Sequence, residues 1–154
     1  MKQKTLIYSL IAYAVVLPYF ARLPRGINWA LQYIPIGMFG NLATELLFSI
    51  FAVIFFGFVS AISAIPMIHC LLRRKSMPLT FLISFTTTTA LLVYFHHDYD
   101  LAADAQAAVG LVFIPICTAV IVAATSLLSG VVELYARKRL KANCRLHGGP
   151  CPPP

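Results

Sequence analysis

The residues best suited to metal or proton chemistry lie close together between positions 96 and 100. His96, His97, Asp98 and Asp100 place two imidazoles and two carboxylates in one short segment, and both groups are ligands of divalent metals. Adjacent histidines project in different directions on a helix or strand, and the chain has no His-x-His or His-x-x-x-His spacing. The pattern therefore favours a solvated turn, with a metal site as the weaker alternative.

A second group of possible ligands lies near the C-terminus. Cys144, His147 and Cys151 could supply three soft donors, whereas a structural zinc site needs four and usually has cysteines two residues apart. The surrounding Gly-Gly-Pro and Pro-Pro-Pro elements favour an extended end. We therefore expect residues 137–154 to form a basic, proline-rich tail, and we expect no bound cofactor.

Catalytic motifs are missing from the sequence. It has no glycine-rich phosphate loop, no G-x-S-x-G and no H-E-x-x-H. Glu45 is the only acidic residue at the start of an apolar run, where it could reach lipid headgroups or pair with Arg22 or Arg25. These residues form a possible polar site, but the sequence as a whole predicts a non-enzymatic protein.

The composition excludes a soluble domain. Of 154 residues, 60% are apolar and 11% are charged, and mean hydropathy is +0.83. So small a chain could not bury this much apolar surface in water. Apolar runs of membrane-spanning length cover about 5–21, 44–68, 79–95 and 107–132. We therefore predict an all-α, integral membrane four-helix bundle over residues 1–136, with an uncleaved first helix because no small residues mark a cleavage site.

The basic residues predict the orientation of this bundle. Ten of the 12 Lys and Arg residues precede the first run, lie between the second and third, or follow the fourth. Only Arg22 and Arg25 lie on the opposite side. By the positive-inside rule both termini are cytoplasmic, and the net charge of +7 reflects orientation rather than nucleic-acid binding.

Two kinds of residue predict contacts with other molecules or between helices. Trp29, Tyr33 and Phe39 give the first outer loop an aromatic character suited to the membrane interface or to a partner. Gly57 and Ala61 form a small-xxx-small pair that lets helices approach closely. The consecutive hydroxyls of 86–89 could bond to their own helix or reach a neighbouring one. Packing within the bundle and association with a partner both remain open.

The segment Asp104–Pro115, Asp-Ala-Gln-Ala-Ala-Val-Gly-Leu-Val-Phe-Ile-Pro, resembles a stretch seen in small inner-membrane proteins of Gram-negative bacteria. In topology and size the whole chain is similar to the immunity proteins that protect bacteria from pore-forming toxins. The resemblance implies a multi-pass protein of the bacterial inner membrane that blocks a toxin by helix–helix and outer-loop contacts.

Three functional hypotheses follow. The leading one is a non-enzymatic binding protein of the toxin-immunity type, with Trp29, Tyr33, Phe39, Gly57 and Ala61 as candidate contact residues and the lipid bilayer and a membrane protein as partners. The first alternative is a small oligomeric transport or channel subunit. The second is a metal-dependent membrane enzyme that uses the His96–Asp100 segment.

Overall fold

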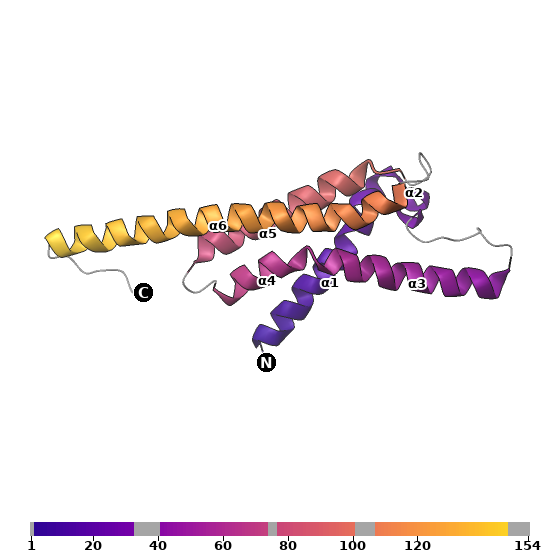
Figure 1. Cartoon of the computed structure of the whole chain (residues 1–154), viewed down its shortest axis with the longest axis horizontal. Helices are drawn as coiled ribbons and strands as arrows, with labels where there is room; N and C mark the ends of the chain where they lie inside the picture. Colours follow the sequence, from indigo (N-terminus) through magenta and orange to yellow (C-terminus); the bar gives the residue numbers. More distant parts are fainter. Residues whose placement is uncertain (1, 33–40, 74–76, 101–106, 148–154) are drawn as a thin grey trace.

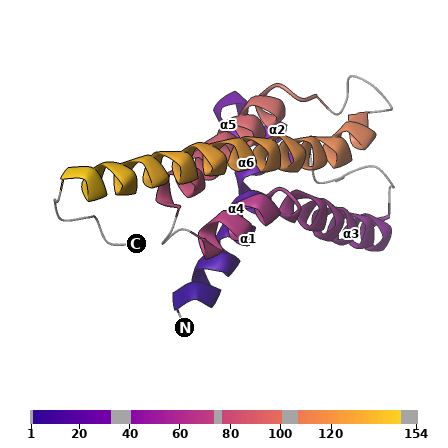
Figure 2. The same cartoon turned by 60° about the vertical axis from the view of Figure 1, so that its left-hand side comes forward.

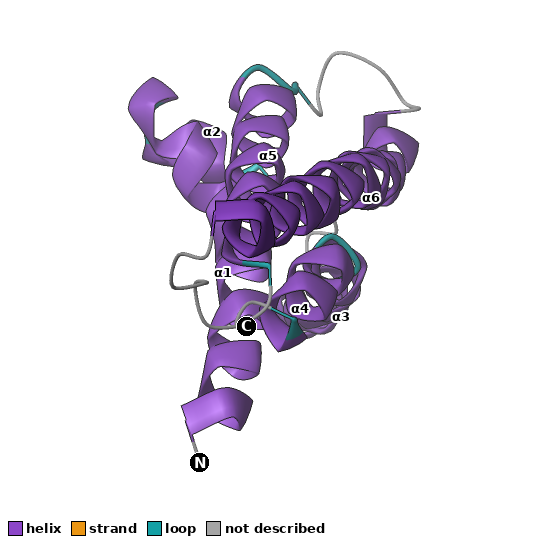
Figure 3. Ribbon diagram, turned by 90° about the vertical axis from the view of Figure 1, so that its left-hand side faces the viewer, coloured by secondary structure: helices purple, strands orange, loops and turns teal. Residues whose placement is uncertain are grey.

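The computed structural model describes residues 2–32, 41–73, 77–100 and 107–147. In chain order the elements are α1 (Lys2–Arg22), the 3-10 turn η1 (Leu23–Arg25), α2 (Ile27–Leu31), α3 (Leu42–Ala61), α4 (Ala64–Leu72), α5 (Pro78–His97) and α6 (Ala107–His147), as labelled in Figure 1. Within these ranges Figure 3 shows helices and connecting loops and no strand. The prediction of an all-helical fold is confirmed for this part of the chain.

Four helical segments are long and apolar enough to cross a membrane: Gln3–Arg25, Leu42–Ala61, Pro78–His97 and Val109–Lys141. Each one overlaps one of the four predicted runs, so the multi-pass prediction is confirmed. Hydrocarbon offers no partner for backbone amides, and an α-helix satisfies these groups within its own segment. We call the end of the bundle where α1 and α5 finish the Arg22 end, and the end where α5 begins the Glu133 end.

The second predicted run, 44–68, forms two helices instead of one. α3 ends at Ala61 and α4 begins at Ala64. Pro66 lacks an amide hydrogen, and its ring conflicts with the carbonyl four residues earlier, at Ile62. The buried Ser63 hydroxyl donates to the Ser60 carbonyl at 2.7 Å across the break. The prediction of one continuous helix is wrong at 62–63, because Pro66 is tolerated in the first turn of a new helix but not in the middle of an old one.

The buried face of α5 repeats every fourth residue and carries small hydroxyl side chains for most of its length. Its buried residues are Thr80, Ser84, Thr88, Leu92 and His96. Small side chains let helices approach closely in lipid, and hydroxyls turned inward avoid contact with hydrocarbon. The Thr88 and Thr89 hydroxyls donate to carbonyls four residues earlier on α5, at 2.8 and 2.9 Å. These bonds match the prediction that hydroxyls in 86–89 could bond to their own helix.

A cluster of apolar side chains joins α1, α4 and α5. Its buried members are Leu10, Ala14, Ala64, Met67 and Leu71, with Phe81 and Phe85 packed against them. The Tyr13 ring stacks on Phe85 at 5.2 Å between centroids. The Tyr13 hydroxyl shares a hydrogen bond with Thr89 at 2.8 Å. A threonine of 86–89 therefore also reaches a neighbouring helix, and this contact fixes where α1 crosses α5.

α6 is longer than the predicted span. It continues past 132 to His147 and passes through Pro115 without interruption. Figures 1 and 2 show its C-terminal part extending beyond the other helices. The first part of the predicted tail is therefore helical. Residues 148–154, which include Cys151, lie outside the described residues, so the Cys144/His147/Cys151 hypothesis stays untested.

Candidate functional site

Arg22 is the last residue of α1 and is completely buried at the Arg22 end. Its Nε donates to the Trp29 carbonyl at 2.9 Å. One terminal nitrogen donates to the Tyr99 carbonyl, and the other donates to Gln32 Oε1 at 2.7 Å. One guanidinium therefore joins α1, α2 and the segment after α5, and its positive charge is favourable at the C-terminus of a helix.

Arg22 is on the buried face of α1. The buried residues Leu10, Ala14 and Pro18 precede it at four-residue intervals, and residues four apart lie on the same side of a helix. Continuing the spacing from Pro18 leads directly to Arg22. Helix geometry thus turns this charge inward, and the hydrogen bonds around it offset the cost of burial.

The Trp29 ring is close to two guanidinium groups. The Arg22 carbon Cζ is 4.9 Å from the centroid of its ring and Arg25 Cζ is 5.3 Å away, within the range of cation–π contacts. Its indole Nε1 donates to the His97 carbonyl at 3.3 Å. The predicted contact residue Trp29 is therefore half-buried and joins α2 to the end of α5.

The segment after α5 reaches the same place through Asp98, the residue that follows the helix. This carboxylate forms an ion pair with Arg25 and lies 2.7 Å from His97 Nδ1. Both members of the ion pair are well exposed, so we expect the pair to contribute at most about 1 kcal/mol. The structure brings Arg22, Arg25, His97 and Asp98 together around Trp29, an arrangement that no local sequence pattern predicts.

Tyr99 and Gly110 complete this end of the bundle and were not predicted as site residues. A Cβ atom added at Gly110 would lie 1.7 Å from the Tyr99 hydroxyl oxygen and 2.7 Å from its Cζ. Only glycine leaves space for the tyrosine ring against α6. The Tyr99 carbonyl in turn accepts from Arg22, so the first turns of α6 are linked to the same cluster. The only sign of this contact in the sequence was the presence of a glycine, Gly110, within Asp104–Pro115.

The apolar surface of this cluster faces outward from η1 and α2. Leu23, Ile27 and Leu31 follow at four-residue intervals, and all three are exposed. We call these three residues the outer ridge. Leu23 is within the apolar span Gln3–Arg25, whereas Ile27 and Leu31 are on the short helix α2. Arg22 holds these segments together through its bonds to Trp29 and Gln32. The outer ridge therefore consists of exposed apolar side chains on segments that Arg22 ties to α1 by hydrogen bonds, and such bonds lower the ordering cost of binding.

The other predicted site residues lie elsewhere. Gly57 faces α1, since an added Cβ would be 3.5 Å from Val15 Cγ1. The structure thus gives it a packing role within the bundle. Ala61 is the half-buried last residue of α3, and Glu45 is in the first turn of that helix. Tyr33 and Phe39 lie outside the described residues.

The geometry gives the metal hypothesis no support. Among the residues that the structure describes, no three His, Cys, Asp or Glu side chains converge on a point where they could hold an ion. His96 is turned into the bundle as the last buried residue of the α5 stripe. Asp98 is directed toward Arg25 and His97 instead. His96, His97, Asp98 and Asp100 are therefore not arranged as a ligand set.

A second buried charge closes the Glu133 end. Glu133 on α6 is 8% exposed. Its Oε2 accepts from the backbone amide of Thr80 at 3.0 Å and from the Thr80 hydroxyl at 2.8 Å. Thr80 lies in the first turn of α5, where amides have no partner within the helix. Glu133 thus caps a neighbouring helix, while its Oε1 accepts from Arg137 at 3.2 Å.

Comparison with known proteins identifies no relative of this chain: no protein-family model, no curated protein and no solved structure matches it.

Proposed function

We propose that this chain is a non-enzymatic binding protein of the bacterial inner membrane, an immunity protein that neutralises a membrane-acting, pore-forming toxin. The observation that carries the proposal is the outer ridge of Leu23, Ile27 and Leu31. These exposed apolar side chains are held at the Arg22 end by a buried guanidinium. An apolar surface beside exposed charges suits recognition of a protein at the membrane surface.

α3 provides a second surface for such a partner. In the most apolar 18-residue stretch of α3 only 6% is buried against the rest of the protein, whereas the corresponding stretches of the other three spans are 22% to 28% buried. Its N-terminal part extends away from the other helices in Figures 1 and 2. Its exposed side chains include Leu47, Phe51, Ile54 and Phe58. In this proposal a helix of the toxin packs along α3 while a loop of the toxin contacts the outer ridge.

The proposed orientation places both termini in the cytoplasm and the outer ridge on the far side. The distribution of basic residues supports it. Arg22 and Arg25, the two basic residues on the opposite side, have structural roles. Arg22 is buried among hydrogen-bond acceptors, and Arg25 forms an ion pair with Asp98. Their presence on the outer side is therefore explained without a topological signal.

The test is protection of cells that express a pore-forming toxin encoded beside this gene. We expect the full chain to restore growth, and Ile27→Asp to abolish protection because a charge in an apolar contact is costly to desolvate. Leu140→Asp is the matched control, since it places the same charge at an exposed position on α6 away from the ridge. Toxicity unchanged by the wild-type protein, or equal loss with both variants at equal membrane levels, would contradict the proposal.

The surface of α3 is tested separately in the same assay. Phe51→Ala should weaken protection, whereas Leu128→Ala, at a similarly exposed position on α6, should not. Both substitutions keep the span apolar, so insertion is not at issue. If the two variants protect equally well, the toxin does not pack along α3.

One observation favours the alternative of a small oligomeric transport or channel subunit. The Ser84 and Thr118 hydroxyls are buried and have no hydrogen-bond partner among the described residues. Polar groups of this kind inside a bundle can line a path for water or ions. Ion flux in proteoliposomes that falls in Ser84→Ala would support a path there. In a channel of this kind Glu45, in the first turn of α3, would be the acidic residue on the ion path. Glu45→Gln should therefore lower the flux as well.

A further inference from the structure

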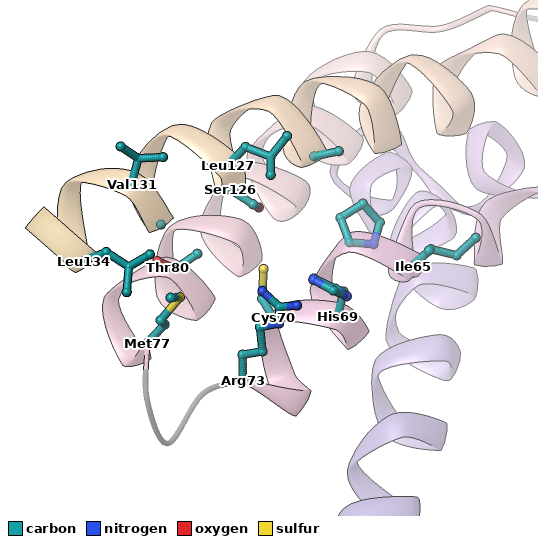
Figure 4. Close-up of a pocket in the computed structure, with 13 residues that line it drawn as sticks. Ile65, His69, Cys70, Arg73, Met77, Thr80, Ser126, Leu127, Val131 and Leu134 are labelled. Atoms are coloured by element: carbon teal, nitrogen blue, oxygen red, sulfur yellow. The ribbon is translucent and has the colours of Figure 1, made fainter. Parts of the chain in front are cut away.

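A cavity of about 420 Å³ lies at the Glu133 end, between α4, the start of α5 and one face of α6. Figure 4 shows His69 and Arg73 on the α4 side and Leu127, Val131 and Leu134 on the α6 side. These five residues are exposed, so the cavity is open at the molecular surface. Its volume is within the range of sites that take small molecules.

The cavity has the shape of a groove about one leaflet long. Along α6 its lining runs from Ala123 to Leu134, which at 1.5 Å per residue is about 16 Å. Half of a hydrocarbon core of about 30 Å is about 15 Å. Gly130 forms part of the floor, and an added Cβ there would approach Thr80 and Met77 only at ordinary contact distances.

The chemistry of the groove changes from one end to the other. We call the end farther from Arg73 the deep end, because it would lie deeper in the bilayer. It is lined by the apolar residues Ile65, Pro66 and Ala123. At the other end Arg73 caps α4, with His69 one turn earlier. The sequence continues with Arg74 and Lys75. Between the two ends the lining is mainly apolar but includes Cys70, Thr80 and Ser126. The lining therefore suits an occupant that is mainly apolar along its length and anionic at the end near Arg73.

We propose that the groove binds one acyl chain of an anionic phospholipid, with the phosphate of its headgroup at Arg73 and His69. Basic pockets between transmembrane helices are a recognised way of holding anionic headgroups. Charge complementarity at one end and apolar length at the other favour this occupant over a second copy of the chain, whose own inner end is also basic. The site is separate from the outer ridge and does not depend on the function proposed above.

The test measures lipid retained by the full-length protein in detergent, by native mass spectrometry. The two probes are phosphatidylglycerol and phosphatidylcholine with identical chains. We expect one phosphatidylglycerol to be retained in preference, and Arg73→Gln to weaken its binding about fivefold, the effect of one basic residue near a headgroup. Ala123→Phe should fill the deep end and weaken binding of both lipids.

Two matched controls distinguish the groove from general effects. Arg139→Gln removes an equal charge from an exposed position on α6, and Ala124→Phe adds the same ring one residue outside the groove. Neither should change lipid retention. Equal losses in Arg73→Gln and Arg139→Gln, or wild-type retention in Ala123→Phe, would overturn the proposal.

A measurement on the wild-type protein does not depend on the variants folding. Phosphatidylglycerol with a photoreactive group at the end of its acyl chain is cross-linked to the full chain, and the labelled peptides are mapped. Label at Ile65, Ala123 and Leu127 is the expected result. Label confined to α3, with none on the residues that line the groove, would show that the lipid chain is not the occupant.

Discussion

Replacing Glu133 by alanine should loosen the contact between α5 and α6. The side chain accepts two hydrogen bonds from Thr80, at 3.0 and 2.8 Å, although it projects from a different helix. The substitution leaves the Thr80 amide in the first turn of α5 without its partner and removes the anion from the positive end of that helix dipole. A buried polar group without a partner is costly, so the loss should be large for one side chain.

The magnitude follows from the two bonds. Hydrogen bonds to charged groups contribute about 1.5–3 kcal/mol each in soluble proteins. Coupling energies between membrane helices average about 0.6 kcal/mol and reach about 1.7 kcal/mol. For two bonds in a membrane protein we therefore expect a coupling free energy of about 1–3 kcal/mol between Glu133 and the Thr80 hydroxyl and amide. Glu133→Gln keeps one acceptor oxygen and should lose about half as much stability as Glu133→Ala.

The assay is a double-mutant cycle on unfolding of the purified protein in mixed micelles, with Glu133→Ala, Thr80→Ala and the double variant. Thr80→Ala removes the hydroxyl bond alone, so the cycle should report a coupling of about 0.6–1.7 kcal/mol for that bond. Lys138→Ala, at an exposed position on α6, is the control for helix propensity and charge. Additive losses in the cycle, or a Glu133→Ala effect no larger than the control, would refute the reasoning.

Two further predictions concern the Arg22 end. Arg22→Lys should not replace arginine, because the single nitrogen of an ammonium cannot reach all three acceptors that separate guanidinium nitrogens reach at Trp29, Gln32 and Tyr99. Fluorescence of Trp29, the only tryptophan, should shift to the red, whereas Arg25→Lys should leave it nearly unchanged. A wild-type spectrum in Arg22→Lys would contradict the role given to the Arg22 hydrogen bonds. Gly110→Ala should displace the Tyr99 ring, since an added Cβ would lie 1.7 Å from its hydroxyl oxygen. We expect the free energy of unfolding to fall by about 1–3 kcal/mol. Gly57→Ala is the control and should cost less, because the nearest side-chain atom there is 3.5 Å from the added Cβ.

Local physics explains why the number and class of helices could be predicted. Runs of apolar residues long enough to cross hydrocarbon have few structural solutions, and all four predicted runs coincide with helices. The break at 62–63 was the main error in the helix boundaries. Pro66 lies two residues before the end of the predicted run 44–68, where a proline costs little, but the apolar pattern does not show where the helix begins again. The long continuation of α6 was also missed, because its polar residues suggested a tail although they form helices well.

The sites depended on contacts between distant segments. Glu133 and Arg137 are four residues apart, a spacing that favours a pair on one helix face, and they form an ion pair at 3.2 Å. The bonds of Glu133 to Thr80 span 53 positions, so no local pattern predicts them. Arg22 was read as a loop charge, although the four-residue spacing from Pro18 already placed it on the buried face of α1. Gly57 shows the opposite case. Its small-xxx-small spacing with Ala61 would suit a partner helix, but in the structure Gly57 packs against Val15 of the same chain.

The positions of the buried charges bear on where this protein can recognise other molecules. Arg22 closes one end of the bundle and Glu133 closes the other, and both have their hydrogen bonds within the chain. Between them the buried face of α5 is mostly hydroxyl-bearing. Charges used in this way stabilise the assembly of the helices and are not displayed to a ligand. The surfaces proposed here for recognition are ones that the helix contacts leave uncovered: the outer ridge, the face of α3 and the groove beside Arg73. Because the ridge and the groove lie at opposite ends, the proposed toxin contact at the ridge and the proposed lipid site would not compete.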